Sequence, residues 1–102
     1  MASYPGLGSV HVGEVLTADG VVGTSGEGSI LFAITIKGGT ATTRAQIYDG
    51  TGTGGTLRED VIAPINDTIT IFYGENGVLY ADGMYLDITT TAGTVTFIYN
   101  QA

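Results

Sequence analysis

The stretch "ILFAITIKGGTATTRAQIYD", residues 30–49, decides the fold class. Apolar and polar residues alternate in its first half, and a period of two is the signature of a half-buried β-strand. The apolar side chains that should share one face are Ile30, Phe32, Ile34 and Ile36. A "KGG" triplet then precedes a second alternating run, residues 41–49. We therefore predict that the two runs form a β-hairpin.

Outward from this stretch, alternating runs recur at intervals of about ten residues, separated by glycine-containing breaks. They are "SVHVGEVL" (9–16), "TLREDVIA" (56–63), "DTITIFY" (67–73), "GVLY" (77–80), "GMYLDIT" (83–89) and "GTVTFIY" (93–99). Gly13 interrupts the first run, which suggests a bulge. Turn dipeptides suited to positive φ are Asp19-Gly20, Asp49-Gly50, Asn76-Gly77 and Asp82-Gly83. The pattern predicts one all-β domain at 10–102, an antiparallel β-sandwich or jelly roll, after an N-terminal arm at 1–9.

Composition excludes several classes of function. Ten acidic and three basic residues give a net charge of −7, the wrong sign for a surface that neutralises phosphates, so no nucleic-acid partner is expected. The absence of cysteine rules out disulfides and thiolate chemistry. The opening "MASYPGLGSV" lacks the basic and apolar regions of a secretion signal. No run approaches the ~18 apolar residues of a membrane span, so we expect a soluble protein that stays where it is made, with no membrane partner.

A glycine-rich segment, "YDGTGTGG", matches the G-x-G-x-x-G pattern of nucleotide-binding loops at Gly50, Gly52 and Gly55. Such a loop must leave a strand and enter a helix whose N-terminus faces the phosphates. Here the next segment, "TLREDVIA", has a strand pattern, and Asp49 would place a like charge beside the ligand. We predict a hairpin loop and no cofactor.

The ionisable residues suggest no reaction centre. His11 is the only histidine, and no nucleophile is singled out to pair with it, so we expect a solvated or interface side chain rather than a catalytic one or a zinc ligand. Glu59 and Asp60 are adjacent in a strand pattern and should leave it on opposite faces. Arg58 beside them should discourage pairing at a sheet edge. We therefore expect no enzyme, with no catalytic, cofactor-binding or metal-binding residues.

Aspartates beside glycines could in principle converge on a calcium ion. Asp49, Asp82 and Asp87 are the candidates, but the chain lacks a D-x-D-x-D-G loop. Turn formation is the simpler role for the first two. Likewise Asn66-Asp67-Thr68 fits a glycosylation acceptor but is more simply a turn into a strand.

The aromatic residues fall into two groups. Tyr73, Phe97 and Tyr99 lie on the apolar phase of their runs and should be core residues. Tyr48, Tyr80 and Tyr85 are expected to be exposed or interfacial. An exposed row of tyrosines could stack on sugar rings, so a carbohydrate-binding or adhesion domain remains the alternative function, with a glycan and calcium as its candidate ligands.

Residues 23–99 resemble a group of small virion proteins of tailed phages. The segments that carry the resemblance are "GSIL" at 28–31, "YDG" at 48–50, "GMYLD" at 83–87 and "GTVTFIY" at 93–99. They correspond to an early G-x-L-type segment, a turn after the second strand, and a closing pair of strands. The chain differs most from the group before Gly23.

The resemblance implies a β-sandwich of the capsid-decoration or cement type, or a head-fibre or tail-associated module. It implies a virion protein, assembled in the host cytoplasm, which binds the major capsid protein and commonly sits as a homotrimer over capsid junctions. No catalytic residues carry over. The arm before the first strand pattern has apolar residues without an evident element, so we expect Tyr4, Pro5 and Leu7 to be interface anchors on a neighbouring subunit or the shell.

Overall fold

The alternating runs of the sequence form strands in the computed structural model, which describes residues 11–90 and 92–101. The anchors expected in the arm, Tyr4, Pro5 and Leu7, lie outside the described residues. Within them the strands are β1 (Val12–Leu16), β2 (Gly20–Val22), β3 (Ser29–Lys37), β4 (Thr43–Asp49), β5 (Thr56–Ala63), β6 (Thr68–Phe72), β7 (Val78–Tyr80), β8 (Met84–Thr89) and β9 (Thr94–Gln101). The described chain holds no helix.

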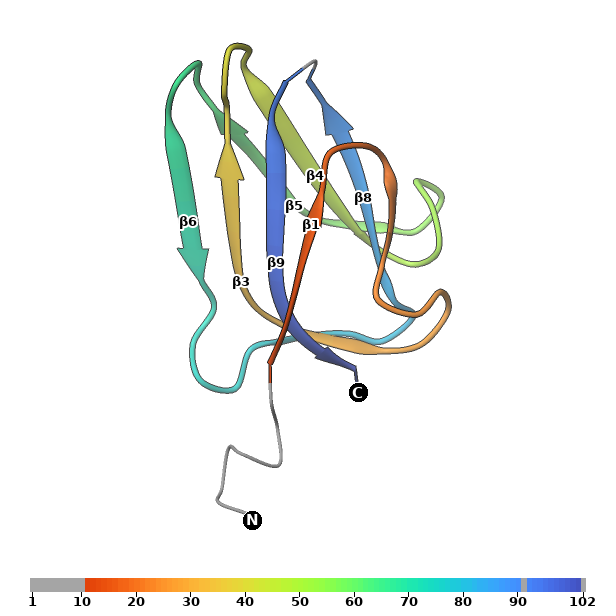
Figure 1. Ribbon diagram of the computed structural model, residues 1–102. Helices are drawn as coiled ribbons and strands as arrows, with labels where there is room; N and C mark the ends of the chain where they lie inside the picture. The colour runs from red at the N-terminus through yellow and green to blue at the C-terminus, as the bar shows by residue number, and fades with distance from the viewer. Residues whose placement is uncertain (1–10, 91, 102) are drawn as a thin grey trace.

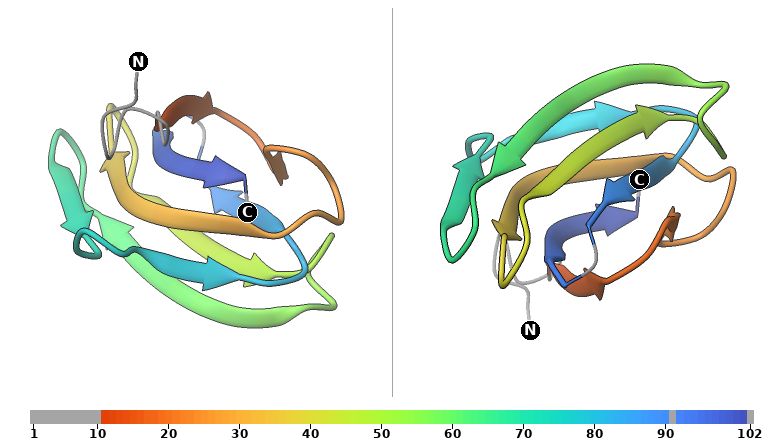
Figure 2. Two further views of the ribbon diagram at one scale, coloured as in Figure 1. Left: turned by 90° about the horizontal axis from the view of Figure 1, so that it is seen from below. Right: turned by 90° about the horizontal axis from the view of Figure 1, so that it is seen from above.

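The strands pair antiparallel in two sheets that face each other. The first, here called sheet A, has the order β1-β9-β3-β6, and β7 also pairs with β3; the second, sheet B, has the order β2-β8-β4-β5. Figure 1 shows sheet A in front of sheet B, and the end-on views of Figure 2 show the two layers. The predicted all-β sandwich is confirmed. The three-residue strand β2 was missed, because "GVV" is too short to show alternation.

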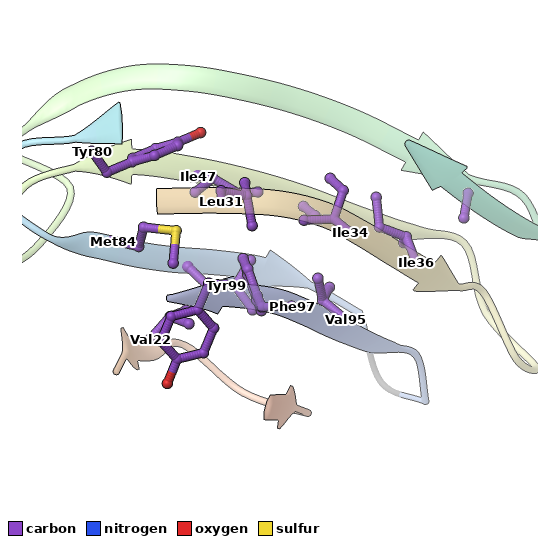
Figure 3. Close-up of a cluster of buried hydrophobic side chains, with 13 residues drawn as sticks. Val22, Leu31, Ile34, Ile36, Ile47, Tyr80, Met84, Val95, Phe97 and Tyr99 are labelled. Atoms are coloured by element: carbon purple, nitrogen blue, oxygen red, sulfur yellow. The ribbon is translucent and has the colours of Figure 1, made fainter. Parts of the chain in front are cut away.

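The core lies between the layers and is built from the alternate positions of the central strands (Figure 3). Sheet A contributes Ile34 and Phe97 from β3 and β9, and sheet B contributes Ile47 and Leu86 from β4 and β8; none of the four is exposed. Burying side chains of this size stabilises the fold by about 1.5–3 kcal/mol each. Tyr99 and Phe97 are buried and Tyr73 packs against the core, as predicted.

The connection between β3 and β4 corrects the hairpin prediction, which was wrong. β3 belongs to sheet A and β4 to sheet B, so Gly38 and Gly39 carry the chain across the sandwich. There Gly38 donates its N–H to the Asp67 carbonyl oxygen at 2.9 Å, and Gly39 accepts from the Asn66 N–H at 2.7 Å. A Cβ on Gly38 would overlap the Pro64 carbonyl oxygen. Two half-buried strands can pair edge to edge or pack face to face, and alternation alone does not separate these outcomes.

Two bulges set which side chains face outward. The pairing of β3 with β9 shifts between Leu31 and Ala33, so Ile34 faces inward while Ile30 and Phe32 face outward. The prediction that all four apolar residues of this strand share a face was therefore wrong for these two. The second shift lies where Ile47 and Tyr48 of β4 meet β5.

The prediction of a bulge at Gly13 was also wrong. β1 pairs with β9 in one continuous register, from Val12 opposite Tyr99 to Leu16 opposite Val95. A Cβ at Gly13 would meet only the Ile98 side chain, at 3.5 Å. The glycine thus keeps ordinary strand geometry beside a bulky neighbour.

Candidate functional site

The outer face of sheet A carries a group of apolar side chains, here called the apolar strip. Phe72 lies opposite Ala33 in the register of β6 and β3, and Ala33 lies opposite Ile98 of β9. Ile30 of β3 lies opposite Leu79 of β7. Phe72 is 68% exposed and Leu79 is 54% exposed. Exposed apolar side chains gathered on one face mark an interaction site more often than scattered single residues do.

Beside the apolar strip runs a row of threonines. Thr96, Thr35 and Thr70 stand opposite one another on β9, β3 and β6, and the hydroxyl groups of Thr35 and Thr70 lie 3.1 Å apart in a hydrogen bond. Val15 of β1, which is 60% exposed, lies opposite Thr96 at one end of this row. Paired hydroxyls of this kind stabilise the strand pairing and leave an uncharged surface.

Charge is nearly absent from this face. Among the described strand positions that point outward from sheet A, Lys37 at the end of β3 carries the only charge. The whole chain has ten acidic residues. Nine lie in turns or on sheet B, and the tenth, Glu14 of β1, lies opposite the buried Phe97 and accepts from the Tyr99 hydroxyl. A companion can therefore approach the outer face of sheet A without meeting a carboxylate, although the protein as a whole is acidic.

His11, at the start of the described chain, lies on the same face. Its ring stacks on Phe32 with centroids 4.0 Å apart and an angle of 15° between the planes. Phe32 points outward at the bulge, yet only 7% of it is exposed. His11 is exposed, as expected, and the stacking brings the entry of β1 against the outer face of sheet A.

The outer face of sheet B is different in character. Tyr48 and Tyr85 stand directly opposite each other on β4 and β8, both half-buried. Gln46 and Asp87 form the next pair along the same strands. Tyr80, in contrast, is 1% exposed and belongs to the core, so its predicted exposure was wrong. Tyr48 and Tyr85 are thus the pair that the sugar-binding alternative can use.

An ion pair also distinguishes sheet B. Arg44 donates to both carboxylate oxygens of Asp60, at 2.8 and 2.6 Å. These hydrogen bonds hold the pKa of Asp60 below its usual value. Glu59 lies opposite the buried Ile47 and Asp60 opposite Gln46, so these two acidic residues leave β5 on opposite faces, as predicted.

The glycine-rich loop joins β4 to β5, which pair antiparallel, so the predicted hairpin loop is confirmed. Gly50 has a φ of 152° and donates its N–H to the Gly83 carbonyl oxygen at 3.0 Å. A Cβ on Gly55 would overlap the Asp49 carbonyl oxygen, whereas one on Gly52 would meet nothing. The first and last glycines of the pattern therefore close a turn.

The carboxylate of Asp49 binds the turn between β7 and β8. It accepts from the backbone N–H groups of Ala81 and Asp82, at 3.2 and 2.8 Å, and lies 3.4 Å from the Arg58 guanidinium. Arg58 also lies over the Tyr80 ring, 5.1 Å from its centroid. β5 is an edge strand as expected, but Arg58 binds Asp49 and Tyr80 across the loop. Asp49 acts in turn formation, the simpler of its two expected roles.

Acidic residues do not gather elsewhere in the part of the chain that is described. No three residues among its histidines, aspartates and glutamates lie close enough to hold a metal ion. Nor does it contain a helix long and apolar enough to cross a membrane.

Buried phenol groups line the interior instead. Burial raises the pKa of Tyr99 to about 12, and a hydrogen bond of 2.9 Å to Glu14 adds to the effect. The pKa values of Tyr73 and Tyr80 are raised above the usual range, mainly by burial and then by the charge of Glu59. These groups stay protonated at neutral pH and cannot act as bases.

Sequence reasoning singled out tyrosines and aspartates and missed the apolar strip. A signal was present: in "DTITIFY", Phe72 occupies the same phase as Thr68 and Thr70, which is the solvent phase of an alternating strand. Leu79 gave no comparable signal because β7 has only three residues.

Comparison with known proteins adds no family assignment: no protein-family model, no curated protein and no solved structure matches this chain.

Proposed function

We propose that this protein is a capsid decoration, or cement, protein of a tailed phage, which binds the major capsid protein and stabilises the head as a homotrimer. The observation that carries the proposal is the outer face of sheet A, where the apolar strip and the threonine row lie side by side with Lys37 as the one charge among the outward strand positions described. The resemblance of residues 23–99 to small virion proteins supports the same conclusion. The protein then belongs to the virion and is assembled in the host cytoplasm.

The protein stabilises the shell by burying surface against it, without any chemical reaction. A protein that binds the assembled shell and not its free subunits lowers the free energy of the shell by an amount set by concentration and affinity. Many copies act on one shell, so a modest affinity per copy is sufficient. A rigid sandwich suits this role, because a preformed surface loses little conformational entropy on binding. The arm contributes Tyr4, Pro5 and Leu7 as anchors on neighbouring subunits.

Shell loading tests the proposal. Purified protein is mixed with heads assembled without it from the major capsid protein of the same genome, and the pellet is analysed after sedimentation. Saturable co-sedimentation, together with greater resistance of the loaded heads to heat, is the expected result. Failure to co-sediment at any concentration would overturn the assignment.

The second candidate is a carbohydrate-binding or adhesion module of a phage fibre or tail. It rests on Tyr48 and Tyr85, which lie opposite each other on β4 and β8, with Gln46 and Asp87 as the next pair along these strands. Aromatic faces flanked by hydrogen-bonding side chains suit a sugar ring. A glycan array, run with and without a chelator, separates the candidates. Binding to one sugar class that is lost in Tyr85→Ala would favour this function over the first.

A further inference from the structure

We propose that residues 1–10 of a second copy of this chain bind to the apolar strip. The inference rests on the proposed assembly role and names the surface through which two copies meet. Three observations carry it: the place where the arm leaves the sheet, the reach of the arm, and the charge of the two surfaces.

The arm leaves the sandwich beside the strip and at the end of the sheet. Val12, the first residue of β1, lies opposite Tyr99, two residues before the end of β9 at Gln101. Figure 1 shows β1 starting at the end of sheet A where β9 ends. The preceding residue, His11, stacks on Phe32 on the outer face. β1 and β6 are the outer strands in the order β1-β9-β3-β6, so Val12 and Phe72 of one copy lie on opposite edges of sheet A.

The arm is long enough for this contact. Ten extended residues span at most about 35 Å, whereas neighbouring strands of a sheet lie only about 4.8 Å apart. Residues 1–10 of one copy can thus cross the whole breadth of a sheet in another copy. The strip itself extends over neighbouring strands only, from Ile98 on β9 to Phe72 on β6.

The charges of the two surfaces suit each other. Residues 1–10 read "MASYPGLGSV" and contain no charged side chain. The outward strand positions of sheet A carry no carboxylate among the described residues. Two copies of net charge −7 each repel one another over most of their surfaces, but the arm and the strip can meet without that cost. Tyr4, Pro5 and Leu7 supply the apolar groups that fill the space beside Phe72 and Leu79.

Engineered disulfides test the contact directly, because the chain has no cysteine of its own. A Leu7→Cys variant is mixed with a Phe72→Cys variant that carries a mass tag, and the mixture is oxidised without shells. Ile62→Cys is the matched control, since Ile62 is 54% exposed and lies on the edge strand of sheet B. We expect the mixed dimer with Phe72→Cys to exceed that with Ile62→Cys by about tenfold or more, because docking raises the local concentration of the thiols.

Two results would overturn the proposal. One is a yield with Phe72→Cys no higher than with Ile62→Cys. The other is an intrachain disulfide as the main product of the double variant Leu7→Cys/Phe72→Cys at high dilution, which would assign the strip to the arm of the same copy. Thermal unfolding of each variant establishes that it is folded. The assay uses purified protein alone, so its failure is distinguishable from failure of the shell-loading test, which needs heads.

A second readout avoids cysteine. Deletion of residues 2–9 and the variant Phe72→Ser should each lower the mass measured by sedimentation equilibrium toward that of the monomer. Ile62→Ser should leave the mass of the assembly unchanged. A full-length protein that is monomeric at every concentration tested would contradict the inference.

Discussion

The carboxylate of Asp49, at the end of β4, accepts a hydrogen bond of 2.8 Å from the backbone N–H of Asp82 in the turn before β8. The same carboxylate accepts from the Ala81 N–H and contacts Arg58. One side chain therefore ties together the hairpin loop of β4 and β5 and the turn between β7 and β8. An acidic residue that looked like a candidate ligand in the sequence is a structural acceptor in the fold.

We expect Asp49→Ala to destabilise the protein by about 1–2 kcal/mol, because it removes a largely buried carboxylate that accepts from two backbone N–H groups of an exposed turn. Urea unfolding monitored by circular dichroism measures the change. Asp82→Ala is the matched control: its side chain is exposed, and the substitution removes the same charge. The control should stay within about 0.5 kcal/mol of the natural protein. Equal losses in both variants would mean that net charge, and not the hydrogen bonds, sets the effect.

The glycine-rich loop yields a second comparison. We expect Gly55→Ala to cost more than about 2 kcal/mol, because the new Cβ would overlap the Asp49 carbonyl oxygen. Gly54→Ala, one residue away, meets nothing within 4 Å. It should leave stability unchanged or raise it by up to about 1 kcal/mol by restricting the unfolded chain. Thermal unfolding of the two variants side by side checks the expectation, and equal destabilisation would contradict the turn geometry described here.

Alternation was sufficient to predict every strand described here except β2, because the longer strands each have a more buried and a more exposed face. It did not predict their partners. The runs of β3 and β4 are separated by only a few residues, as in a hairpin, yet Gly38 and Gly39 pack against the turn at Pro64 and Asn66. That contact depends on residues far along the chain, and no local pattern contains it.

The candidate surface was harder to predict for a related reason. The pairing of β3 with β9 contains a bulge between Leu31 and Ala33. Residues before the bulge therefore point to the opposite face from the one that simple alternation predicts. Ile30 and Phe32 consequently lie on the outer face and not in the expected core. Tyr80 moved the other way, into the core, because β7 pairs with β3 at a position where Tyr80 lies opposite the buried Ser29. Facing is set by register, and register is set by long-range pairing.

Alkaline pH should destabilise the fold. The usual tyrosine pKa is 10.0, and in the native state that of Tyr99 is about 12. The native state therefore keeps this phenolic proton at pH values where the unfolded chain releases it. The contribution to stability is complete below pH 10 and is lost as the pH rises toward 12, at up to about 1.4 kcal/mol per pH unit for each such tyrosine. Tyr73 and Tyr80 are shifted in the same direction.

Tyr99→Phe tests the contribution of one hydroxyl. Phenylalanine keeps the ring in the core and removes the titrating group, so the free energy of unfolding should fall less steeply with pH above 10 than in the natural protein. Tyr85→Phe, on the outer face of sheet B, is the control. Denaturant unfolding at a series of pH values gives both slopes. An unchanged slope in Tyr99→Phe would show that its proton is not held by the folded state.

Assembly on the shell should depend on sheet A and not on sheet B. Phe72→Asp places a carboxylate in the apolar strip of a face that otherwise carries none among its described strand positions. Phe72 is largely exposed in the single chain, so the fold itself should tolerate the change. A charge without a partner is costly to bury in the proposed contact between copies, and the homotrimer is the form proposed to bind the shell. We therefore expect shell loading to weaken by more than about tenfold. Ile62→Asp adds the same charge on sheet B and should load normally. Co-sedimentation with undecorated heads measures both variants, and an equal loss with Ile62→Asp would mean that acidity in general, rather than the apolar strip, governs attachment.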